Sequence, residues 1–223
     1  MSRNQEGWIR QYQQKGALWL HDGDPRRPHA LLTSGKHSNG FFNSELVMED
    51  SLLLDEASSD LVDLLLNDGM DVNAVDRVVG PAMGAITLAH DISRHIARRR
   101  GRSCLRAYTE KETELTNGKM MVFKRTTIHS TEGVLMVEDV LTTGGSVILT
   151  DTAVKVMCGY TQSVVAVLVN RSGLTCVGDK KIVALIDHYM PVWTPEGCPL
   201  CKEGSEAIRP KGTENWARLN ATY

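Results

Sequence analysis

The chain has 223 residues, of which 42% are hydrophobic, and it carries a formal net charge of −2 at pH 7. This size permits one α/β domain with a subdomain, or at most two small domains, and the near-neutral charge argues against nucleic-acid binding by the whole surface. No apolar run approaches the roughly 18 residues of a membrane span, and the polar N-terminal segment has no signal-peptide pattern. Five cysteines, with one Cys-x-x-Cys pair, favour a reducing cytoplasm over a disulfide framework.

The first third of the chain predicts one clear helix. Residues 21–43 are rich in Gly, Pro, His and Ser, which is typical of a loop with short extended pieces. Leucines and alanine recur on one side of 51–66, which predicts an amphipathic helix there. Residues 191–223 hold several prolines and glycines around the cysteine pair, and we expect both chain ends to form a small cap on the core.

The middle of the chain alternates short apolar runs with amphipathic stretches. Such alternation predicts a mostly parallel sheet flanked by helices, in which ligands bind beyond the carboxyl ends of the strands. The run at 120–124 is expected to pair with the preceding strand as a hairpin across Asn117-Gly118. The predicted strands are 77–80, 104–108, 120–124, 133–139, 163–169 and 182–186, and the predicted helices are 85–99 and 147–158.

The strongest signal is the segment Val134–Ser146, with the sequence VLMVEDVLTTGGS. Four apolar residues drive a strand through the core, and Glu138 and Asp139 then appear at its carboxyl end. Glycines and hydroxyl side chains before a helix form a cradle for an anion, and the acid pair can hold hydroxyls or hydrated Mg²⁺. The alternative is an ordinary capped helix with solvated acids. A Walker loop is excluded because its lysine is missing.

This segment resembles the signature of type I phosphoribosyltransferases for phosphoribosyl pyrophosphate (PRPP). The resemblance implies a mostly parallel five-stranded sheet flanked by helices, with a small hood. It implies that the acid pair holds the ribose hydroxyls, that the following loop holds the 5′-phosphate, and that Mg²⁺ is bound through PRPP with Glu138 and Asp139. The implied PRPP contacts in this segment are Glu138, Asp139, Val140, Leu141, Thr142, Thr143, Gly144, Gly145 and Ser146.

Three further segments resemble the orotate phosphoribosyltransferases within that family. Residues 79–85 are similar to their pyrophosphate loop, which implies PRPP contacts by Pro81, Ala82 and Met83; a plain Gly-Pro turn is the alternative. Residues 31–38, followed by Phe41 and Phe42, resemble the hood segment that covers the base. The tail 196–212 is similar to the Thermus-type branch. The implied base contacts of the hood segment are Lys36, Phe41 and Phe42, although the two aromatics fit a cap core equally well.

Arg171 is the residue expected to bind the carboxylate of orotate, together with Thr142. It follows a predicted strand on the ligand side, and a guanidinium suits a planar carboxylate. The family usually has aspartate before this arginine, whereas this chain has Asn170. A surface arginine without a partner is the alternative.

Lys111 and Lys119 are the candidates for contacting the pyrophosphate that leaves. The segment after 108 resembles the family's mobile loop, which closes over PRPP from a neighbouring subunit and so implies a homodimer. Acidic Glu112 and Glu114 accompany the lysines, and a solvated hairpin of mixed charge is the alternative. Lys111 and Asp139 are therefore the expected catalytic residues.

Together these features predict one phosphoribosyltransferase domain over 1–223, with a core at about 51–189 and a hood from about 1–50 and 190–223. The implied function is Mg²⁺-dependent transfer of phosphoribosyl from PRPP to orotate, a pentosyltransferase reaction of pyrimidine biosynthesis in the cytoplasm. No nucleic acid or membrane partner is expected. A transferase for another base, such as a purine, and a non-catalytic regulator that senses PRPP are the alternatives.

Two features remain open at this point. Cys198 and Cys201 are either buried thiols or half of a zinc site, which Cys176, His188 or a partner chain would have to complete. The basic run 94–102 fits a solvated helix end better than a nucleic-acid site, because a single cluster lacks the rest of such a footprint.

Overall fold

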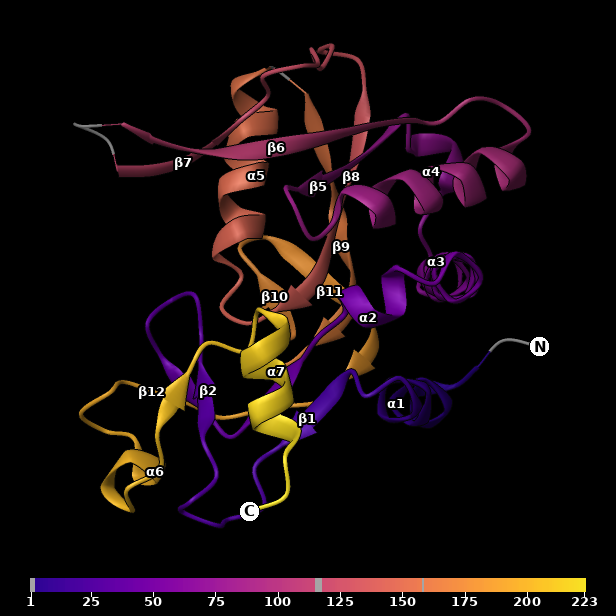
Figure 1. The fold of residues 1–223 in the computed structure, drawn as a ribbon. Coiled ribbons are helices and arrows are strands. Elements are labelled where there is room, and N and C mark those ends of the chain that lie inside the picture. The colour runs from indigo at the N-terminus through magenta and orange to yellow at the C-terminus, as the bar shows by residue number, and fades with distance from the viewer. Residues whose placement is uncertain (1–2, 115–117, 158) are drawn as a thin grey trace.

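The structure is a computed structural model that describes residues 3–114, 118–157 and 159–223. Within these residues a seven-stranded sheet forms the centre, in the order β10-β11-β9-β8-β5-β6-β7 (Figure 1). Strands β11, β9, β8, β5 and β6 run parallel, which confirms the predicted five-stranded parallel core, and β10 and β7 add antiparallel edges. The strands are β5 (Arg77–Pro81), β6 (Leu105–Glu114), β7 (Gly118–Val122), β8 (Gly133–Leu141), β9 (Tyr160–Asn170), β10 (Cys176–Val177) and β11 (Lys180–Asp187).

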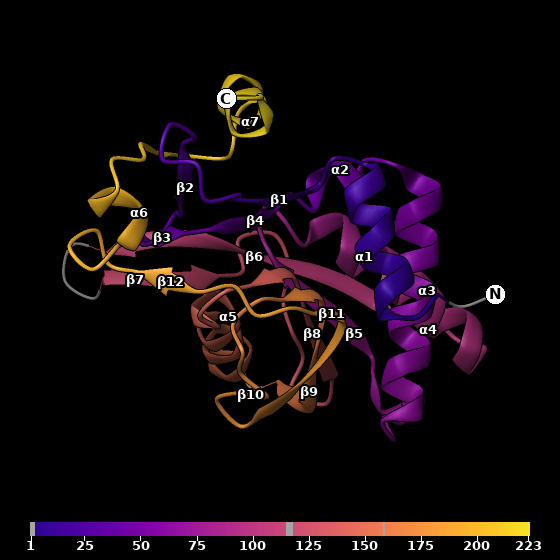
Figure 2. The ribbon, with the colours of Figure 1, turned by 90° about the horizontal axis from the view of Figure 1, so that it is seen from below.

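Helices cover both faces of this sheet. Helices α1, α3 and α4 lie on one side and α5 lies on the other (Figures 1 and 2). The predicted helix at 147–158 is α5, which ends at Val156, and Cys158 lies outside the described residues. The elements of this part are α1 (Gln5–Gln14), α2 (Glu45–Met48), α3 (Ser51–Asn67), α4 (Ile86–Arg100), α5 (Gly145–Val156) and a 3₁₀ turn at Val72–Ala74.

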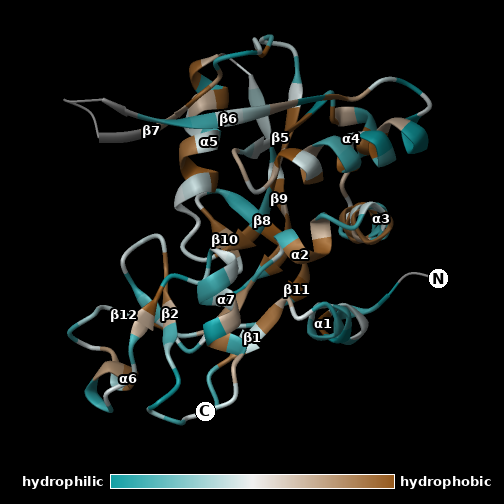
Figure 3. Cartoon of the chain, in the orientation of Figure 1, coloured by the Kyte–Doolittle hydropathy of each residue, from teal (hydrophilic) through white to brown (hydrophobic). Residues whose placement is uncertain are grey.

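Strand β8 shows why its sequence is continuously apolar. Leu135 and Val137 join the core beneath α3 and α4, whereas Met136 and Val134 join the smaller clusters beneath α5. Successive side chains of a strand point to opposite faces, so a strand that is covered on both faces needs apolar residues at every position. The strand then becomes hydrophilic at its carboxyl end (Figure 3), where the acid pair begins.

Helix α1 is an element that the sequence pattern did not predict. It has only two buried residues, Trp8 and Tyr12, which are four positions apart and therefore lie on one face. Asn4 caps the helix by accepting a hydrogen bond from the amide of Gly7, and the indole of Trp8 donates to Asp60 at 2.9 Å. A helix with so narrow an apolar stripe resembles a polar loop in sequence.

Both ends of the chain meet in a second sheet, of the order β12-β3-β2-β13, beyond the carboxyl ends of the central strands (Figure 1). We call this sheet, the β1–β4 pair and helices α6 and α7 the hood. Its own core is small and centres on Trp19, Ala30, Leu32, Ile208 and Leu219. The hood elements are β1 (Leu18–Leu20), β2 (His29–Leu31), β3 (His37–Ser38), β4 (Gly40–Phe42), β12 (Val192–Trp193), α6 (Pro199–Lys202), β13 (Ala207–Ile208) and α7 (Thr213–Asn220).

The predicted hairpin is formed by β6 and β7, which pair from Glu110 and Val122 to Glu114 and Gly118. Its expected turn at Asn117 falls at 115–117, outside the described residues.

Arg77, the first residue of β5, forms a buried ion pair with Glu132 through two hydrogen bonds, at 2.6 and 2.9 Å. No helix in the described part of the chain is both long and apolar enough to cross a membrane.

Candidate functional site

The acid pair lies at the carboxyl end of β8. Glu138 is buried, and Asp139 beside it is partly exposed. Burial raises the pKa of Glu138 well above its usual value, and the negative charge of Asp139 adds to this rise. Two carboxylates in one partly desolvated place favour a ligand that brings hydroxyl donors or a cation.

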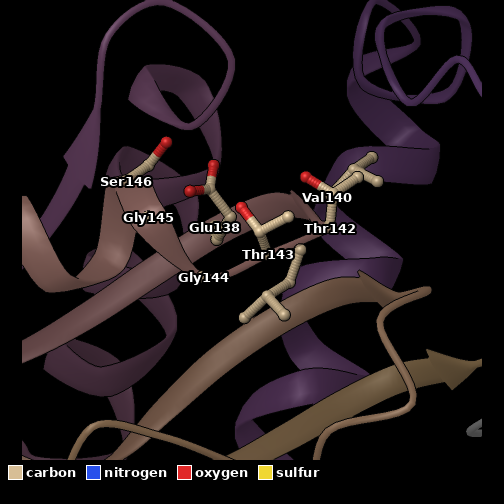
Figure 4. Close-up of a pocket in the computed structure, with 8 residues that line it drawn as sticks. Glu138, Val140, Thr142, Thr143, Gly144, Gly145 and Ser146 are labelled. Carbon is tan, nitrogen blue, oxygen red and sulfur yellow. The ribbon is translucent and has the colours of Figure 1, made fainter. Parts of the chain in front are cut away.

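The loop after β8 is a cradle at the start of α5. Gly144 caps α5 with φ +76°, and a Cβ there would lie 2.2 Å from Cγ2 of Val177, so both the backbone conformation and the packing require glycine. No described side chain caps this helix, which leaves its first amides for an anion. Figure 4 shows the Glu138 carboxylate and the Thr143 and Ser146 hydroxyls on one side of the loop. A small hollow here is lined by Glu138, Val140, Leu141, Thr142, Thr143, Gly144, Gly145 and Ser146.

The loop between β5 and α4 reaches the acid pair. A Cβ on Gly84 would lie 2.6 Å from Oδ2 of Asp139, so the loop backbone passes directly against this carboxylate. The amide of Ala82 donates to the carbonyl of Thr109 at 2.7 Å, and the Met83 side chain is 83% exposed. The structure therefore brings the predicted loop at 81–83 beside the predicted ribose site. Gly84 was not predicted from the sequence as a site residue, although a glycine just before a predicted helix could have pointed to it.

Lys111 lies on β6, opposite Met121 of β7, with its side chain exposed. Its positive charge opposes the rise in the pKa of Glu138. Lys119 lies on β7 opposite Thr113. Both candidate lysines therefore belong to the β6–β7 hairpin.

Arg171 follows β9 directly and is 1% exposed, so it is not the surface arginine of the alternative reading. Its Nη1 donates to the carbonyl of Gly40 at 2.9 Å, and its Nη2 donates to Oγ of Ser38 at 2.5 Å. Its backbone amide donates to the carbonyl of Leu141, at the start of the cradle. Burial lowers the pKa of the guanidinium to about 10, and Nε has no partner among the described residues.

Asn170 departs from the aspartate expected before Arg171, and the structure shows how it fits. Its Oδ1 accepts from the amide and the hydroxyl of Ser172, at 3.1 and 2.6 Å. Its Nδ2 donates to the carbonyl of Leu174 at 2.8 Å. The Asn170 side chain therefore accepts hydrogen bonds as an aspartate would, and its Nδ2 group donates one more, which closes the turn after β9.

The hood residues predicted to contact the base lie in three different environments. Phe42 is 2% exposed and packs edge-on against Tyr12, at 5.4 Å between ring centroids, which is the core role that the sequence left open. Phe41 is half-buried and packs against Trp216 of α7. Lys36 is partly exposed in the turn between β2 and β3. Thr142, the other proposed base contact, is partly exposed in the cradle.

Comparison with solved structures places the fold in a class. An orotate phosphoribosyltransferase from Aeropyrum pernix matches with a TM-score of 0.56 at 21% identity, over 80% of this chain and 92% of that one. This chain therefore has the fold of the phosphoribosyltransferases, in agreement with the prediction.

Sequence comparison narrows the class, although no model of a protein family matches. The orotate phosphoribosyltransferase of Desulforamulus reducens is 35% identical over 182 residues, which are 82% of this chain and 87% of the relative. The orotate phosphoribosyltransferase of Caldicellulosiruptor bescii is 32% identical over 209 residues, which are 93% of this chain and 97% of that relative. The chain belongs to the orotate phosphoribosyltransferase family.

Proposed function

We propose that this protein transfers phosphoribosyl from PRPP to orotate, giving orotidine 5′-monophosphate and pyrophosphate. The buried guanidinium of Arg171 is the observation that carries the choice of base. A charge taken out of water is costly unless it has a partner, and the described residues offer Arg171 a hydroxyl and a carbonyl but no carboxylate. A carboxylate on the substrate supplies the missing charge, and among the common nucleobases and their precursors orotate carries one.

The rest of the site supports PRPP as the other substrate. The amides at the start of α5 and the hydroxyls of Thr142, Thr143 and Ser146 bind the 5′-phosphate, because they are unpaired donors grouped at a helix N-terminus. Glu138 and Asp139 accept hydrogen bonds from the ribose hydroxyls. The loop at 81–84 lies against Asp139, which positions its backbone for the pyrophosphate.

The acid pair also fits Mg²⁺, which we propose as the cofactor. Mg²⁺ binds oxygen ligands, and a cation relieves the mutual repulsion that helps to raise the pKa of Glu138. Glu138 and Asp139 would hold the ion together with PRPP, and the ion would supply positive charge next to the pyrophosphate group.

The chain itself then has little chemistry to perform. The bond between C1 and pyrophosphate breaks through an oxocarbenium-like state, and a nitrogen of orotate attacks C1, so that no protein nucleophile is needed. The cradle and Arg171 hold the two substrates in line. The ammonium of Lys111 stabilises the negative charge that grows on pyrophosphate, and the hood excludes water that would hydrolyse PRPP.

We also propose a cytoplasmic homodimer. The β6–β7 hairpin extends from the sheet edge (Figure 1), where it can contact a second subunit. Sedimentation of the active enzyme tests this, and a monomer with full turnover would contradict it.

The test of the proposed function is PRPP consumption with orotate, uracil, adenine and guanine. Fast release of pyrophosphate with orotate, and only slow release with uracil, adenine and guanine, is the expected result. Turnover of a purine in place of orotate would establish the transferase for another base, and PRPP binding without pyrophosphate release would establish a sensor.

Arg171→Ala tests the residue behind this choice. Removing one partner of a desolvated charge pair costs roughly 2–5 kcal/mol, which corresponds to a loss in orotate use of about 30-fold to several thousandfold. Arg171 also anchors Ser38 and Gly40, so the measure is the ratio of orotate to uracil turnover, which a general loosening of the hood leaves unchanged. Arg26→Ala, at an exposed position, is the control. An unchanged ratio would remove the assignment of Arg171, and with it the argument for orotate from the site.

A further inference from the structure

Four side chains that can bind a metal converge inside the hood. His29 and His37 come from the neighbouring strands β2 and β3, Cys198 is the residue that precedes α6, and Cys201 lies within α6. His29, His37 and Cys198 are buried and Cys201 is partly so, and their four ligand atoms lie within 4.8 Å of one another. The thiols anticipated as half a zinc site are thus joined by two histidines from the other end of the chain. The partners suggested by the sequence, Cys176 and His188, are not in this group.

Four of the six separations between the ligand atoms are near the edge lengths of a tetrahedron around one ion. With Zn–S bonds of about 2.3 Å and Zn–N bonds of about 2.0–2.1 Å, a tetrahedral centre requires edges of about 3.3 Å between nitrogens and about 3.6 Å between nitrogen and sulfur. Here Nε2 of His29 lies 3.0 Å from Nδ1 of His37 and 3.5 Å from each sulfur. Sγ of Cys201 lies 3.2 Å from Nδ1 of His37.

Hydrogen bonding alone accounts poorly for this arrangement. The hydroxyl of Ser205 donates its only proton to the carbonyl of Arg27, at 2.6 Å, so its oxygen accepts from Nδ1 of His29, at 2.8 Å. A neutral imidazole that donates through Nδ1 has its lone pair on Nε2. That single lone pair lies within hydrogen-bonding distance of three groups, Nδ1 of His37 and the two thiols, whereas a cation satisfies all four ligand atoms at once.

We propose that His29, His37, Cys198 and Cys201 bind one structural Zn²⁺ ion. Two sulfurs and two imidazole nitrogens in tetrahedral array suit zinc rather than magnesium or calcium, which take oxygen ligands. Four protein ligands leave no open position for a substrate, so the site is structural. Ser205 orients His29 from outside, as hydrogen-bond acceptors commonly do for ligating histidines.

The ion has a clear role in a hood with so small a core. Helix α6 has four residues and lacks a side-chain cap, and only two-residue strands hold the segment around it. The metal would connect this segment to strands β2 and β3 through His29 and His37. It also fixes His37, next to Ser38, which accepts the hydrogen bond from Arg171. The zinc site therefore stabilises the part of the hood that holds the base-binding arginine.

Metal analysis of the enzyme purified under reducing conditions tests the proposal directly. One zinc ion per chain is expected. Replacement by Co²⁺ should give the visible absorption of a tetrahedral centre and a thiolate charge-transfer band. Zn²⁺ should also protect two thiols from a thiol reagent. These measurements use the wild-type chain, so absence of metal together with failure to bind Zn²⁺ or Co²⁺ would overturn the proposal even if no variant folds.

Variants locate the site. Cys198→Ser and Cys201→Ser should lose the zinc and the cobalt bands, whereas Cys176→Ser, at an exposed cysteine outside the group, should retain both. Ser205→Ala should weaken zinc affinity by about 10- to 100-fold while leaving the four ligands in place. If Cys198→Ser binds zinc as tightly as the wild type, the ion lies elsewhere and the assignment fails.

Hydrogen exchange tests the structural role. Chelation should increase exchange of the amides in β2, β3 and β13 while those of β8 and β9 remain protected. Equal exchange throughout the chain with and without zinc would show that the ion does not hold the hood.

Discussion

Replacing Gly84 by alanine tests whether the loop at 81–84 and Asp139 act as one site. The added Cβ would lie 2.6 Å from Oδ2 and 2.8 Å from Oδ1 of Asp139, whereas ordinary contacts begin at 3.4 Å. The carboxylate must therefore move by about 0.8 Å, or the loop must move away from it. Either change removes a charged hydrogen bond to the ribose, which is worth roughly 1.5–3 kcal/mol. At 1.4 kcal/mol per tenfold, kcat/KM for PRPP should fall about 10- to 150-fold.

The assay is initial-rate kinetics with PRPP varied at saturating orotate, with thermal unfolding as the check on folding. Asp139→Ala provides the second arm of a double-mutant cycle, because it removes the atoms that the new methyl would meet. In that background Gly84→Ala should cost little, so the two losses should not add. An equal loss in both backgrounds would refute the reasoning, since the methyl would then act through the loop and not through the carboxylate. Full activity of Gly84→Ala alone would remove Asp139 from the proposed ribose site.

The other predictions concern three charged residues. Lys111→Ala should lower kcat more than it raises KM for PRPP, because the charge that it meets grows in the transition state; a change in KM alone would make Lys119 the candidate. The raised pKa of Glu138 means that its contribution to stability is full below the ordinary value of 4.5 and is lost as pH rises through the raised pKa. Glu138→Gln should therefore raise the Tm of the ligand-free protein near neutral pH and not near pH 4, and a constant difference would show that ionisation is not the cause. Glu132→Gln leaves Arg77 buried without its carboxylate and should cost about 3–5 kcal/mol in urea unfolding, while a loss below 1 kcal/mol would show that water reaches the pair.

The central sheet was predictable because its strands are covered on both faces. The run at 134–137 is apolar and buried at every position, as a strand that is covered on both faces requires. The cradle was predictable from its residue types, because an acid pair, two glycines and hydroxyl side chains after a buried strand are typical of an anion-binding loop. The role of Gly84 could be recognised only from the fold, because Gly84 in the β5–α4 loop contacts Asp139 of β8, 55 positions later in the chain.

The hood was the part that the sequence could not specify. Its strands have two or three residues, too few for a period of two to be seen. The sequence could not show whether Phe42 stacks on the base or packs in the core, and its contact with Tyr12 in the structure shows the core role. His29 and His37 carry no signal by themselves, because the two cysteines that lie beside them in the fold are more than 150 positions away in the chain.

The sheet shared by the two chain ends has a consequence for the order of folding during synthesis. β2 pairs with β13 through Ala30 and Ile208, and β3 pairs with β12 through Ser38 and Val192, so these bonds close very long loops. An isolated two-stranded piece such as β2–β3 is marginally stable in water. The central sheet can assemble once β11 has left the ribosome, but β2 and β3 must wait for the last thirty or so residues, since distant contacts form late. A nascent chain stalled before β12 should therefore carry a finished phosphate cradle and an unfinished base pocket.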